Sequence, residues 1–562
     1  MQLHIALVCA LVLAVVQSLA AAAGNSTESA SSSSAASSPS SSATSAAAAS
    51  SPSSSATSAS NSSAASASSS SAPASSGVAG GANGTTHTNG TGTTNTTANT
   101  YDEPKLRAIL GSNDTKKFEV GMRLPNTSFD IPPSWAGNLP VSNKSDETRN
   151  IYFWMFPATG DVGHDDVVFW MNGGPGCSAL SSLMGENGPL SFDPVTYVAK
   201  PAPQTWTKLA NIVWIDQPAG TGFALGAAKN QSMEEVAEDF NGFLLNLYKT
   251  FPKLHGKRMW IGGESFAGKF VPFMADQIYK NETENKAAGM DLQGILITDP
   301  LFAPNVVTKD VGAVEFGLSH AKLLNFTQEQ VQELEQIGEQ NGISTFMRDN
   351  LVYPPKGPIQ LPKQLNASFS PYKHLQKILR KNNPCTSPYY ILNKACSVDA
   401  LGMNATVEKS SATNYFNNMT GVKEFIHAPT NVSWMQCASD KPFKTMKNAK
   451  TGYPVPEVLS RVIEKSNRTM VGHGTYDFVV LYNGTALALQ NMTWHGKQGF
   501  QSPPKQKLLT NGQEEGYYQT ERGLTFFVLE KAGHMLPRYA PGASFRLLEY
   551  LLGQKTLEQL ND

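Results

Sequence analysis

Six short apolar runs constrain the fold of this chain more than any other feature. They are rich in β-branched and aromatic residues, and they lie at residues 151–156, 166–172, 211–216, 258–263, 294–299 and 524–530. Because they are apolar almost throughout instead of at alternate positions, they indicate strands that are buried on both faces. Stretches with helical periodicity, such as 232–252 and 266–280, lie between them. The pattern predicts an α/β fold in which a mostly parallel central sheet carries helices on both faces.

The first 100 of the 562 residues do not fit this pattern. Residues 1–20 have a polar start, an apolar run and a small-residue exit, which predicts a secretory signal peptide, with a membrane anchor as the alternative. Residues 21–100 are mostly Ser, Ala, Thr, Gly and Asn. Such a segment has too little apolar surface to offset the entropy of folding, so we expect it to be disordered and O-glycosylated. Residues 101–562 are expected to form the folded domain.

The segment from about 303 to 465 interrupts the alternation of strands and helices. It contains helical stretches, several prolines and three of the four cysteines that remain after signal removal. We interpret it as a cap that is inserted over the sheet. The folded part is long enough for one large core with such an insertion.

Charge and composition exclude several classes of partner. The 44 Lys and Arg residues nearly balance the 45 Asp and Glu residues, so nothing indicates binding to nucleic acid or to an anionic membrane. Residues 551–562 are polar, and no membrane span is expected after signal removal. Sequons for N-linked glycans are frequent, as in glycoproteins of the secretory pathway. They include Asn113, Asn126, Asn281, Asn366, Asn404 and Asn467.

The cysteines predict disulfides. Cys9 lies in the predicted signal peptide, which leaves Cys177, Cys385, Cys396 and Cys437. An even number in an exported chain favours two disulfides, for which three connectivities are possible. Cys385 and Cys396 are close in sequence, so we expect them to pair and to leave Cys177 for Cys437. A zinc site is the alternative, but no C-x-x-C spacing supports it.

Ser265 is the candidate nucleophile. It lies in GGESFAG, between an apolar strand pattern at 258–261 and a helical pattern. A serine on a tight strand-to-helix turn is typical of the nucleophile elbow of α/β-hydrolases. The second glycine, Gly268, is displaced by one position from the G-x-S-x-G pattern, and an inert serine in a glycine-rich turn is the alternative. The strand before and the helix after favour the nucleophile.

A serine nucleophile needs a base and an orienting acid. His534 follows the apolar run at 524–530, and Asp477 follows another short apolar stretch and a glycine turn. A structural histidine and a surface aspartate are the alternatives for the two residues. However, the order Ser265, Asp477, His534 is that of α/β-hydrolases, and ligands bind at the carboxyl ends of strands in open α/β sheets.

The glycine-rich stretch WMNGGPGCSAL, residues 170–180, follows a strand pattern upstream of Ser265. Backbone N–H groups in such a turn are suited to stabilise an oxyanion. A phosphate-binding loop is the alternative, but the Lys-Ser/Thr ending of that motif is missing.

These stretches, taken in order, resemble the serine carboxypeptidase family. They are SWAGNLPV (134–141), NGGPGCS (172–178), DQPAGTGF (216–223), GESFAG (263–268) and GHMLP (533–537). The resemblance runs from about Ser134 to Gly553 and is weakest in the predicted cap. It implies an α/β-hydrolase fold and a serine-type carboxypeptidase with Ser265, Asp477 and His534 as its catalytic residues.

The resemblance also implies roles for other residues. The oxyanion donors would be the backbone N–H groups of Gly174 and Phe266. The residues that bind the substrate's C-terminal carboxylate would be Asn172, Gly173, Glu186 and Glu264. The residues near the substrate pockets would be Trp170, Phe266 and Met535. The family also pairs the cysteine at the position of Cys177 with a distant one, which agrees with Cys437.

The chain departs from the family pattern at several positions. Gly474, Thr475 and Tyr476 precede Asp477 where the family often has an acidic residue, ENGP replaces ELGP, AGKF replaces a His-Tyr or Arg-Tyr ending, and GILITDP lacks an Asn-Gly step. None of these differences removes a catalytic residue. They therefore bear on substrate preference more than on activity.

The two glutamates predict a pH dependence. Two carboxyl groups in contact do not both ionise easily, so one keeps its proton and is able to donate a hydrogen bond to a carboxylate. We therefore predict a secreted, cell-wall or vacuolar carboxypeptidase that acts at acidic pH on the C-termini of peptides and proteins, with no metal or cofactor. An acyltransferase or esterase on the same scaffold, and an inactive stalked binding protein, are the alternatives.

Overall fold

The computed structural model describes residues 101–192, 198–227, 231–365, 368–393, 411–438, 443, 446, 452–510 and 512–561. The predicted signal peptide, the Ser/Thr-rich segment and Cys396 lie outside the described residues. Among the described residues, no helix combines the length and the apolar character that a membrane crossing requires.

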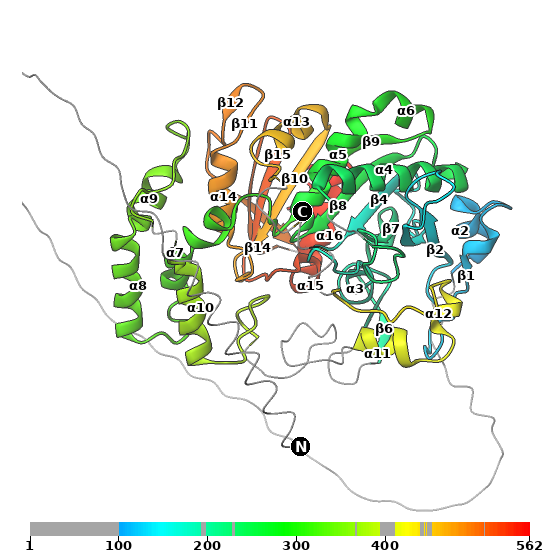
Figure 1. Ribbon diagram of the computed structural model, residues 1–562, viewed down its shortest axis with the longest axis horizontal. Helices are drawn as coiled ribbons and strands as arrows, with labels where there is room; N and C mark the ends of the chain where they lie inside the picture. The colour runs from blue at the N-terminus through cyan, green and yellow to red at the C-terminus, as the bar shows by residue number, and fades with distance from the viewer. Residues whose placement is uncertain are drawn as a thin grey trace, which may run out of the picture. The chain divides into compact units, whose positions relative to one another are not determined.

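An 11-stranded mixed sheet forms the centre of the domain (Figure 1). Its order is β1-β2-β3-β7-β4-β8-β9-β10-β15-β14-β13. The middle strands from β7 to β15 are parallel, and the strands at both ends are antiparallel. The bounds are β1 Glu119–Val120, β2 Ser134–Pro140, β3 Asn150–Phe156, β4 Asp166–Met171, β7 Asn211–Asp216, β8 Arg258–Glu264, β9 Asp291–Thr298, β10 Arg468–Gly474, β13 Gln506–Thr510, β14 Gln513–Glu521 and β15 Leu524–Leu529. Two separate hairpins consist of β5 Leu190–Phe192 with β6 Ala199–Pro201, and β11 Thr493–Trp494 with β12 Lys497–Gln498.

All six predicted runs are strands of the large sheet. The run at 151–156, which is β3, differs from the expectation in direction, because β3 pairs antiparallel with both of its neighbours. An antiparallel strand inside a wide sheet is also covered on both faces, so an apolar run does not reveal its direction.

The α-helices that accompany the sheet are α2 Glu103–Leu110, α3 Leu180–Gly185, α4 Met233–Thr250, α5 Ala267–Lys280, α6 Glu282–Ala287, α7 Ala313–Ser319, α8 Gln328–Gln340, α9 Ile343–Asn350, α10 Pro371–Asn382, α11 Ser411–Asn418, α12 Val422–Phe425, α13 Glu457–Lys465, α14 Tyr482–Gln490, α15 Leu536–Tyr539 and α16 Pro541–Leu551. The long helix α4 begins with a capping box, in which Ser232 and Glu235 each bond the other's backbone N–H.

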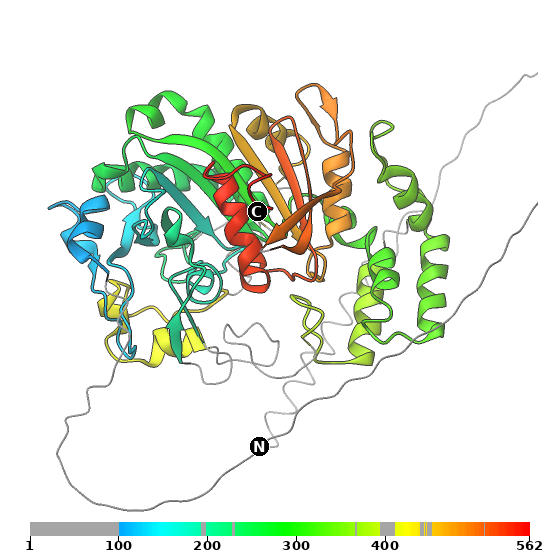
Figure 2. The ribbon, with the colours of Figure 1, turned by 180° about the vertical axis from the view of Figure 1, so that it is seen from behind.

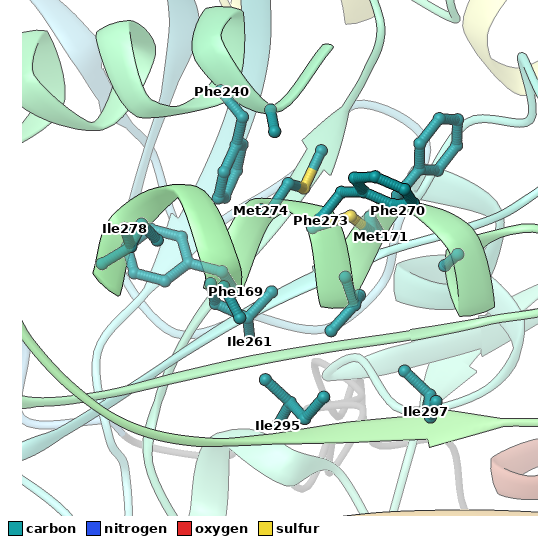
Figure 3. Packing of buried hydrophobic residues seen from close by; sticks show 14 of the residues in the cluster. Phe169, Met171, Phe240, Ile261, Phe270, Phe273, Met274, Ile278, Ile295 and Ile297 are labelled. Atoms are coloured by element: carbon teal, nitrogen blue, oxygen red, sulfur yellow. The ribbon is translucent and has the colours of Figure 1, made fainter. Parts of the chain in front are cut away.

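Alternate side chains of the central strands enter two separate cores. On β4, Phe169 and Met171 belong to one core, whereas Val168 and Trp170 belong to the other. The first core lies between the sheet and helices α4 and α5, as Figure 3 shows. The second core includes residues of α3 and α16, and Figure 2 shows α16, in red, across that face. Burial on both sides explains why the strand sequences are apolar throughout.

The predicted insertion is helical in its first part. Helices α7 to α10 pack around apolar clusters of their own, and one of these clusters includes Phe478 and Leu481, which follow β10. Helix α13, in contrast, contributes Leu459, Val462 and Ile463 to the first core of the main body. Helix α13 therefore packs with the main body, and the extent of the predicted cap, about 303–465, stays a prediction.

Candidate active site

Every candidate catalytic residue follows the carboxyl end of a parallel strand. Ser265 follows β8, Asp477 follows β10, and His534 follows β15, while Asn172 comes directly after β4. Since the carboxyl ends of parallel strands lie at one edge of the sheet, residues that are far apart in sequence meet there.

Ser265 lies on a sharp turn between β8 and α5. Its φ angle is +64°, a left-handed conformation that non-glycine residues adopt at a cost of about 1–2 kcal/mol. Hydrogen bonds from its N–H to Thr298 O (3.0 Å) and from Leu301 N to its O (2.9 Å) hold the turn. At Gly268 a Cβ atom would lie 2.6 Å from Cβ of Pro300, so only glycine fits there. The displaced glycine therefore serves the close approach of α5 to its neighbour.

His534 and Asp477 form a buried pair. Nδ1 of His534 lies 2.8 Å from Oδ2 of Asp477, and the two residues are 2% and 0% exposed. The backbone N–H of His534 donates to Tyr389 O at 2.7 Å, which fixes the loop. Burial alone would raise the pKa of Asp477, but the charge of His534, its hydrogen bond and the nearby ring of His473 lower it to about 2. The aspartate is thus ionised and orients the imidazole.

One cavity of about 130 Å³ brings the predicted site residues together. Its walls include Ser265, His534 and Met535. They also include Asn172, Gly173, Gly174, Glu186 and Glu264, together with Cys177 and Cys437. The sequence did not point to Tyr389 and Val479, which line the same cavity.

The predicted oxyanion donors have free hydrogen-bonding capacity. Neither Gly174 N–H nor Phe266 N–H donates to an acceptor among the described residues. Phe266 is the N-cap of α5, where the helix dipole favours negative charge. Gly173 makes the close approach of the two segments possible, since a Cβ there would lie 2.3 Å from the backbone N of Phe266.

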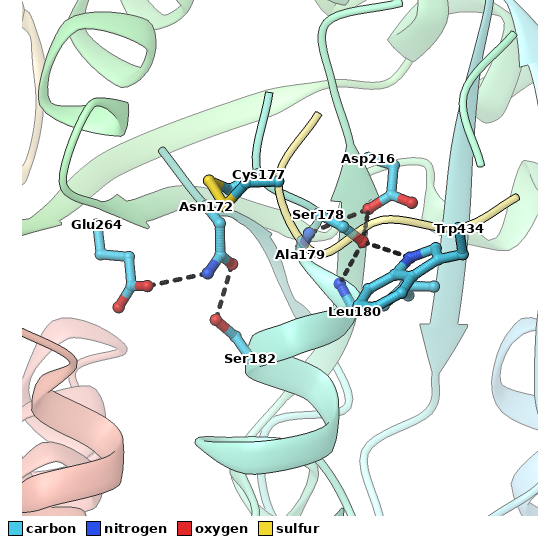
Figure 4. Close-up of a disulfide and its surroundings, with 10 residues drawn as sticks. Asn172, Cys177, Ser178, Ala179, Leu180, Ser182, Asp216, Glu264 and Trp434 are labelled. Atoms are coloured by element: carbon cyan, nitrogen blue, oxygen red, sulfur yellow. Dashed lines mark hydrogen bonds between the residues drawn. A yellow bond between two sulfur atoms is a disulfide. The ribbon is translucent and has the colours of Figure 1, made fainter. Parts of the chain in front are cut away.

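The two glutamates are linked to each other and to Asn172. Nδ2 of Asn172 donates to Oε1 of Glu264 at 2.9 Å, and Oγ of Ser182 lies 2.7 Å from Oδ1 of Asn172, as Figure 4 shows. Oγ of Ser182 also lies 2.7 Å from Oε1 of Glu186. Burial raises the pKa of Glu186, and burial together with the charge of Glu186 raises the pKa of Glu264 well above its usual value. The pair therefore holds a proton where isolated glutamates would be ionised.

A buried network anchors the NGGPGCS turn. Oγ of Ser178 donates to Oδ1 of Asp216 at 2.6 Å, and Nε1 of Trp434 donates to Oγ of Ser178 at 3.1 Å (Figure 4). Burial raises the pKa of Asp216 to about 6, although the hydrogen bonds from Ser178 and from nearby backbone N–H groups lower it. The disulfide between Cys177 and Cys437, with an S–S distance of 2.03 Å, ties the turn to the segment before residue 439.

Cys385 is also disulfide-bonded. Its expected partner, Cys396, lies outside the described residues, so the pairing of these two cysteines stays a prediction.

Trp170 and Phe266 are both buried, and their expected places near the substrate stay predictions. Trp170 is fully buried in the second core, edge-to-face with Trp206 at 4.9 Å, and is not among the described residues that line the cavity. Phe266 is 3% exposed, and its ring packs edge-to-face on Phe270 at 5.1 Å. Side chains alternate between the faces of β4, so a strand residue close to the site in sequence enters the core instead.

The sequence also did not reveal Asp299 and His473. Asp299 follows β9, and one oxygen of Asp299, one of Asp477 and a ring nitrogen of His534 lie within 4.8 Å of one another. A metal ion would accept this spacing, but the hydrogen bond from His534 to Asp477 accounts for that contact without one. Asp299 carries no motif, and only its place beside β10 brings it to the site.

The chain is similar to known carboxypeptidases over most of its length. The family model described as serine carboxypeptidase matches residues 128–554. The "Probable serine carboxypeptidase" of Arthroderma benhamiae is 36% identical, over 78% of this chain and 87% of that protein. "Serine-type carboxypeptidase F" of Aspergillus niger is 35% identical, over 79% and 88%.

Among solved structures, a prohormone-processing carboxypeptidase from Saccharomyces cerevisiae matches with a TM-score of 0.62 at 20% identity. The match covers 78% of this chain and 96% of that one, which supports the α/β-hydrolase fold. Together with the matched family model, these relatives make the chain a member of the serine carboxypeptidase family.

Proposed function

We propose that this protein removes C-terminal residues from peptides at acidic pH, with Ser265, His534 and Asp477 as its catalytic triad. The observation that carries the proposal is that the carboxyl pair Glu186 and Glu264 lines the same small cavity as Ser265 and His534. A nucleophile beside a carboxylate-binding group suits a terminal peptide bond better than an internal one.

In the first half-reaction, Nε2 of His534 takes the proton of Ser265 Oγ as the oxygen attacks the carbonyl carbon of the last peptide bond. The N–H groups of Gly174 and Phe266 stabilise the oxyanion that forms. His534 then gives its proton to the leaving nitrogen, and the terminal amino acid departs. In the second half-reaction, water attacks the acyl-enzyme with His534 as base and releases the shortened peptide.

The glutamate pair gives the reaction its pH dependence. At acidic pH the pair holds protons, and it donates hydrogen bonds to the substrate's terminal carboxylate. Because the pKa of both glutamates is raised, the protons persist above the usual range of a carboxyl group and are lost only at higher pH. The ionised pair then repels the carboxylate, so KM rises with pH.

The cellular location follows from the disulfide chemistry. A disulfide in the wall of the active site needs an oxidising compartment, which the secretory pathway provides. Glycans at the predicted sequons fit the same location, and the cell wall, the vacuole and the extracellular space are all reached by that route.

The test is the hydrolysis of an N-blocked hydrophobic dipeptide from acidic to neutral pH, as the free acid and as the C-terminal amide. We expect cleavage of the free acid, strongest at acidic pH, and much weaker cleavage of the amide. A Ser265→Ala variant is the control and should be inactive. Serine-dependent activity that ignores the carboxylate would replace the proposal by an esterase or acyltransferase, and no activity from folded protein would indicate a binding protein.

A further inference from the structure

A second pair of carboxyl groups lies behind the catalytic histidine. Asp299 and Asp477 are both 0% exposed, on neighbouring strand ends, and one oxygen of each lies within 4.8 Å of the other and of a ring nitrogen of His534. No Lys or Arg among the described residues forms an ion pair with either carboxyl group. Two negative charges at this distance in a buried site would repel each other strongly, so one of the groups keeps a proton.

The hydrogen-bond donors decide which group is ionised. Oδ2 of Asp477 accepts from Nδ1 of His534, and Oδ1 of Asp477 accepts from the N–H groups of Val479 (2.6 Å) and Val480 (3.3 Å). Asp299 accepts only one such bond, from Gly474 N to its Oδ1 at 2.9 Å. The charge therefore belongs on Asp477, where three N–H groups stabilise it.

The remaining oxygen of Asp299 identifies the site of the proton. Oδ2 of Asp299 is buried and has no hydrogen-bond donor among the described residues. A carboxylate oxygen without a donor is costly to bury, whereas a protonated oxygen would itself be a donor to a neighbouring acceptor. Asp299 holds a φ angle of +46° in this position, and Gly472 O accepts from its N–H at 2.8 Å.

We propose that Asp299 is a positioning residue for the catalytic pair of Asp477 and His534. Asp299 remains protonated and donates a hydrogen bond to Asp477. This rests on the proposed triad. The proton that Asp299 shares spreads part of the negative charge of Asp477 away from His534. Burial and the charge of Asp477 raise the pKa of Asp299 well above its usual value, which agrees with the geometry.

Other charged and titratable groups face this pair. Nε2 of His473 lies 3.5 Å from Asp299 and 3.4 Å from Asp477, but its closest partner is Val480 O at 3.0 Å, to which it donates. Glu264 at the end of β8 and Glu186 after α3 add negative charge near Asp299, and Lys309 adds positive charge near Asp477. The glutamates further disfavour a charge on Asp299.

The neutral state of Asp299 matters because His534 must act as a base at acidic pH. A second negative charge beside Asp477 would stabilise the imidazolium form, and His534 would then stay protonated in the pH range that the glutamate pair requires. The hydrogen bond from Asp299 keeps both pairs functional at the same pH.

The experiment compares two replacements of Asp299. Asp299→Asn keeps a neutral donor toward Asp477 and an acceptor for Gly474 N–H, whereas Asp299→Gly removes the donor without adding strain at positive φ. The readout is the acid limb of kcat/KM for an N-blocked amino acid ester, because an ester lacks the carboxylate that the glutamates bind. Thermal unfolding is followed for each variant, and Asp276→Asn, which replaces a buried aspartate far along α5, is the matched control.

For Asp299→Asn we expect an acid limb at the wild-type pH and kcat within about threefold of wild type. For Asp299→Gly we expect kcat to fall about tenfold or more and the acid limb to move to higher pH, since the charge of Asp477 is then concentrated on His534. The infrared absorbance of protonated carboxyl groups at neutral pH should be smaller in Asp299→Asn than in the wild type, by the contribution of one group.

An acid limb that moves to lower pH in Asp299→Asn would overturn the proposal, because it would mean that a negative charge had been removed. Equal activity of Asp299→Gly and wild type would also overturn it. Failure of the triad itself is detected separately, since a fluorophosphonate would then not label Ser265 in the wild type.

Discussion

The site contains two pairs of carboxyl groups with different surroundings. Glu186 and Glu264 line the cavity beside Ser265, while Asp299 and Asp477 are sealed behind His534. In both pairs the groups are too close and too buried to ionise together. The difference in access decides the role. The proton of the glutamate pair, which lines the cavity, is available to a substrate, and the proton of the sealed pair, Asp299 and Asp477, stays within the protein.

The donors around each pair add to this difference. The glutamates have side-chain partners, Asn172 and Ser182, and the pKa of both is raised. In the sealed pair Asp477 accepts from two backbone N–H groups and from His534, whereas Asp299 accepts from one backbone N–H group. The charge of His534 lowers the pKa of Asp477, while burial and the charge of Asp477 raise that of Asp299. An uneven supply of donors separates the two pKa values and assigns one acid and one anion.

The largest effect is expected from Asp477→Asn, which breaks the sealed pair. The amide would hold His534 in the wrong tautomer, and kcat should fall about 10⁴-fold with little change in KM. Steady-state kinetics on a free-acid dipeptide at acidic pH would measure this. A change that appeared mainly in KM would mean that Asp477 serves substrate binding, and it would remove the distinction between the pairs.

A smaller effect, confined to binding, is expected when the glutamate pair, Glu186 and Glu264, is replaced by amides. In wild type, KM for a free-acid dipeptide should rise about 10- to 100-fold from acidic to neutral pH, as charged hydrogen bonds are lost. In the double variant Glu186→Gln/Glu264→Gln, KM should no longer depend on pH, and kcat should change little. Asp299→Asn serves as the matched control, in which the rise of KM with pH should remain.

Protein stability should sharpen the comparison further. A carboxyl group whose pKa is raised by folding stabilises the folded state fully at pH values below its pKa in the unfolded chain, which is about 4. This contribution is lost as the pH rises through its pKa in the folded state. Each such group adds a slope of about 1.4 kcal/mol per pH unit, downward with rising pH. Asp299→Asn and Glu264→Gln should each make the decline of the free energy of unfolding with pH shallower, by the contribution of one group.

Urea unfolding at several pH values between acidic and neutral would measure these slopes. In wild type, Asp216 contributes only up to a pH of about 6, whereas Asp299 and Glu264 should extend the decline beyond it. An unchanged slope in Asp299→Asn would show that Asp299 is ionised in the folded protein.

The sequence revealed the parts of the site that depend on local pattern. Ser265 was recognised from a strand, a glycine turn and a helix in succession, and His534 and Asp477 from their order and their place after apolar runs. The central strands were visible because burial on both faces requires apolar side chains at every position. These features depend on a few neighbouring residues, which a single sequence contains.

The remaining features depend on contacts between distant segments. Asp299 lies at the end of a predicted strand, but it gains its role from its place beside β10, which begins at Arg468. No motif in the sequence around Asp299 indicates that contact. The direction of β3 is fixed by its pairing partners, and Trp170 enters the core because of its face on β4. Pairing and face are decided by the tertiary structure, so the local pattern was not sufficient.

The smallest effect is expected from Trp170→Phe, which tests whether β4 contributes to the substrate cavity. Trp170 is fully buried, and its Nε1 has no hydrogen-bond partner among the described residues, so a smaller ring should lower the free energy of unfolding by about 1–2 kcal/mol and leave kcat/KM unchanged. Met535→Ala, which alters the cavity wall, should instead raise KM for a hydrophobic terminal residue several-fold, by about 1 kcal/mol of lost contact. Because Met535 is also buried, the same change should lower the free energy of unfolding by about 2–5 kcal/mol. If the two variants raised KM alike, Trp170 would belong to the substrate pocket and not only to the core.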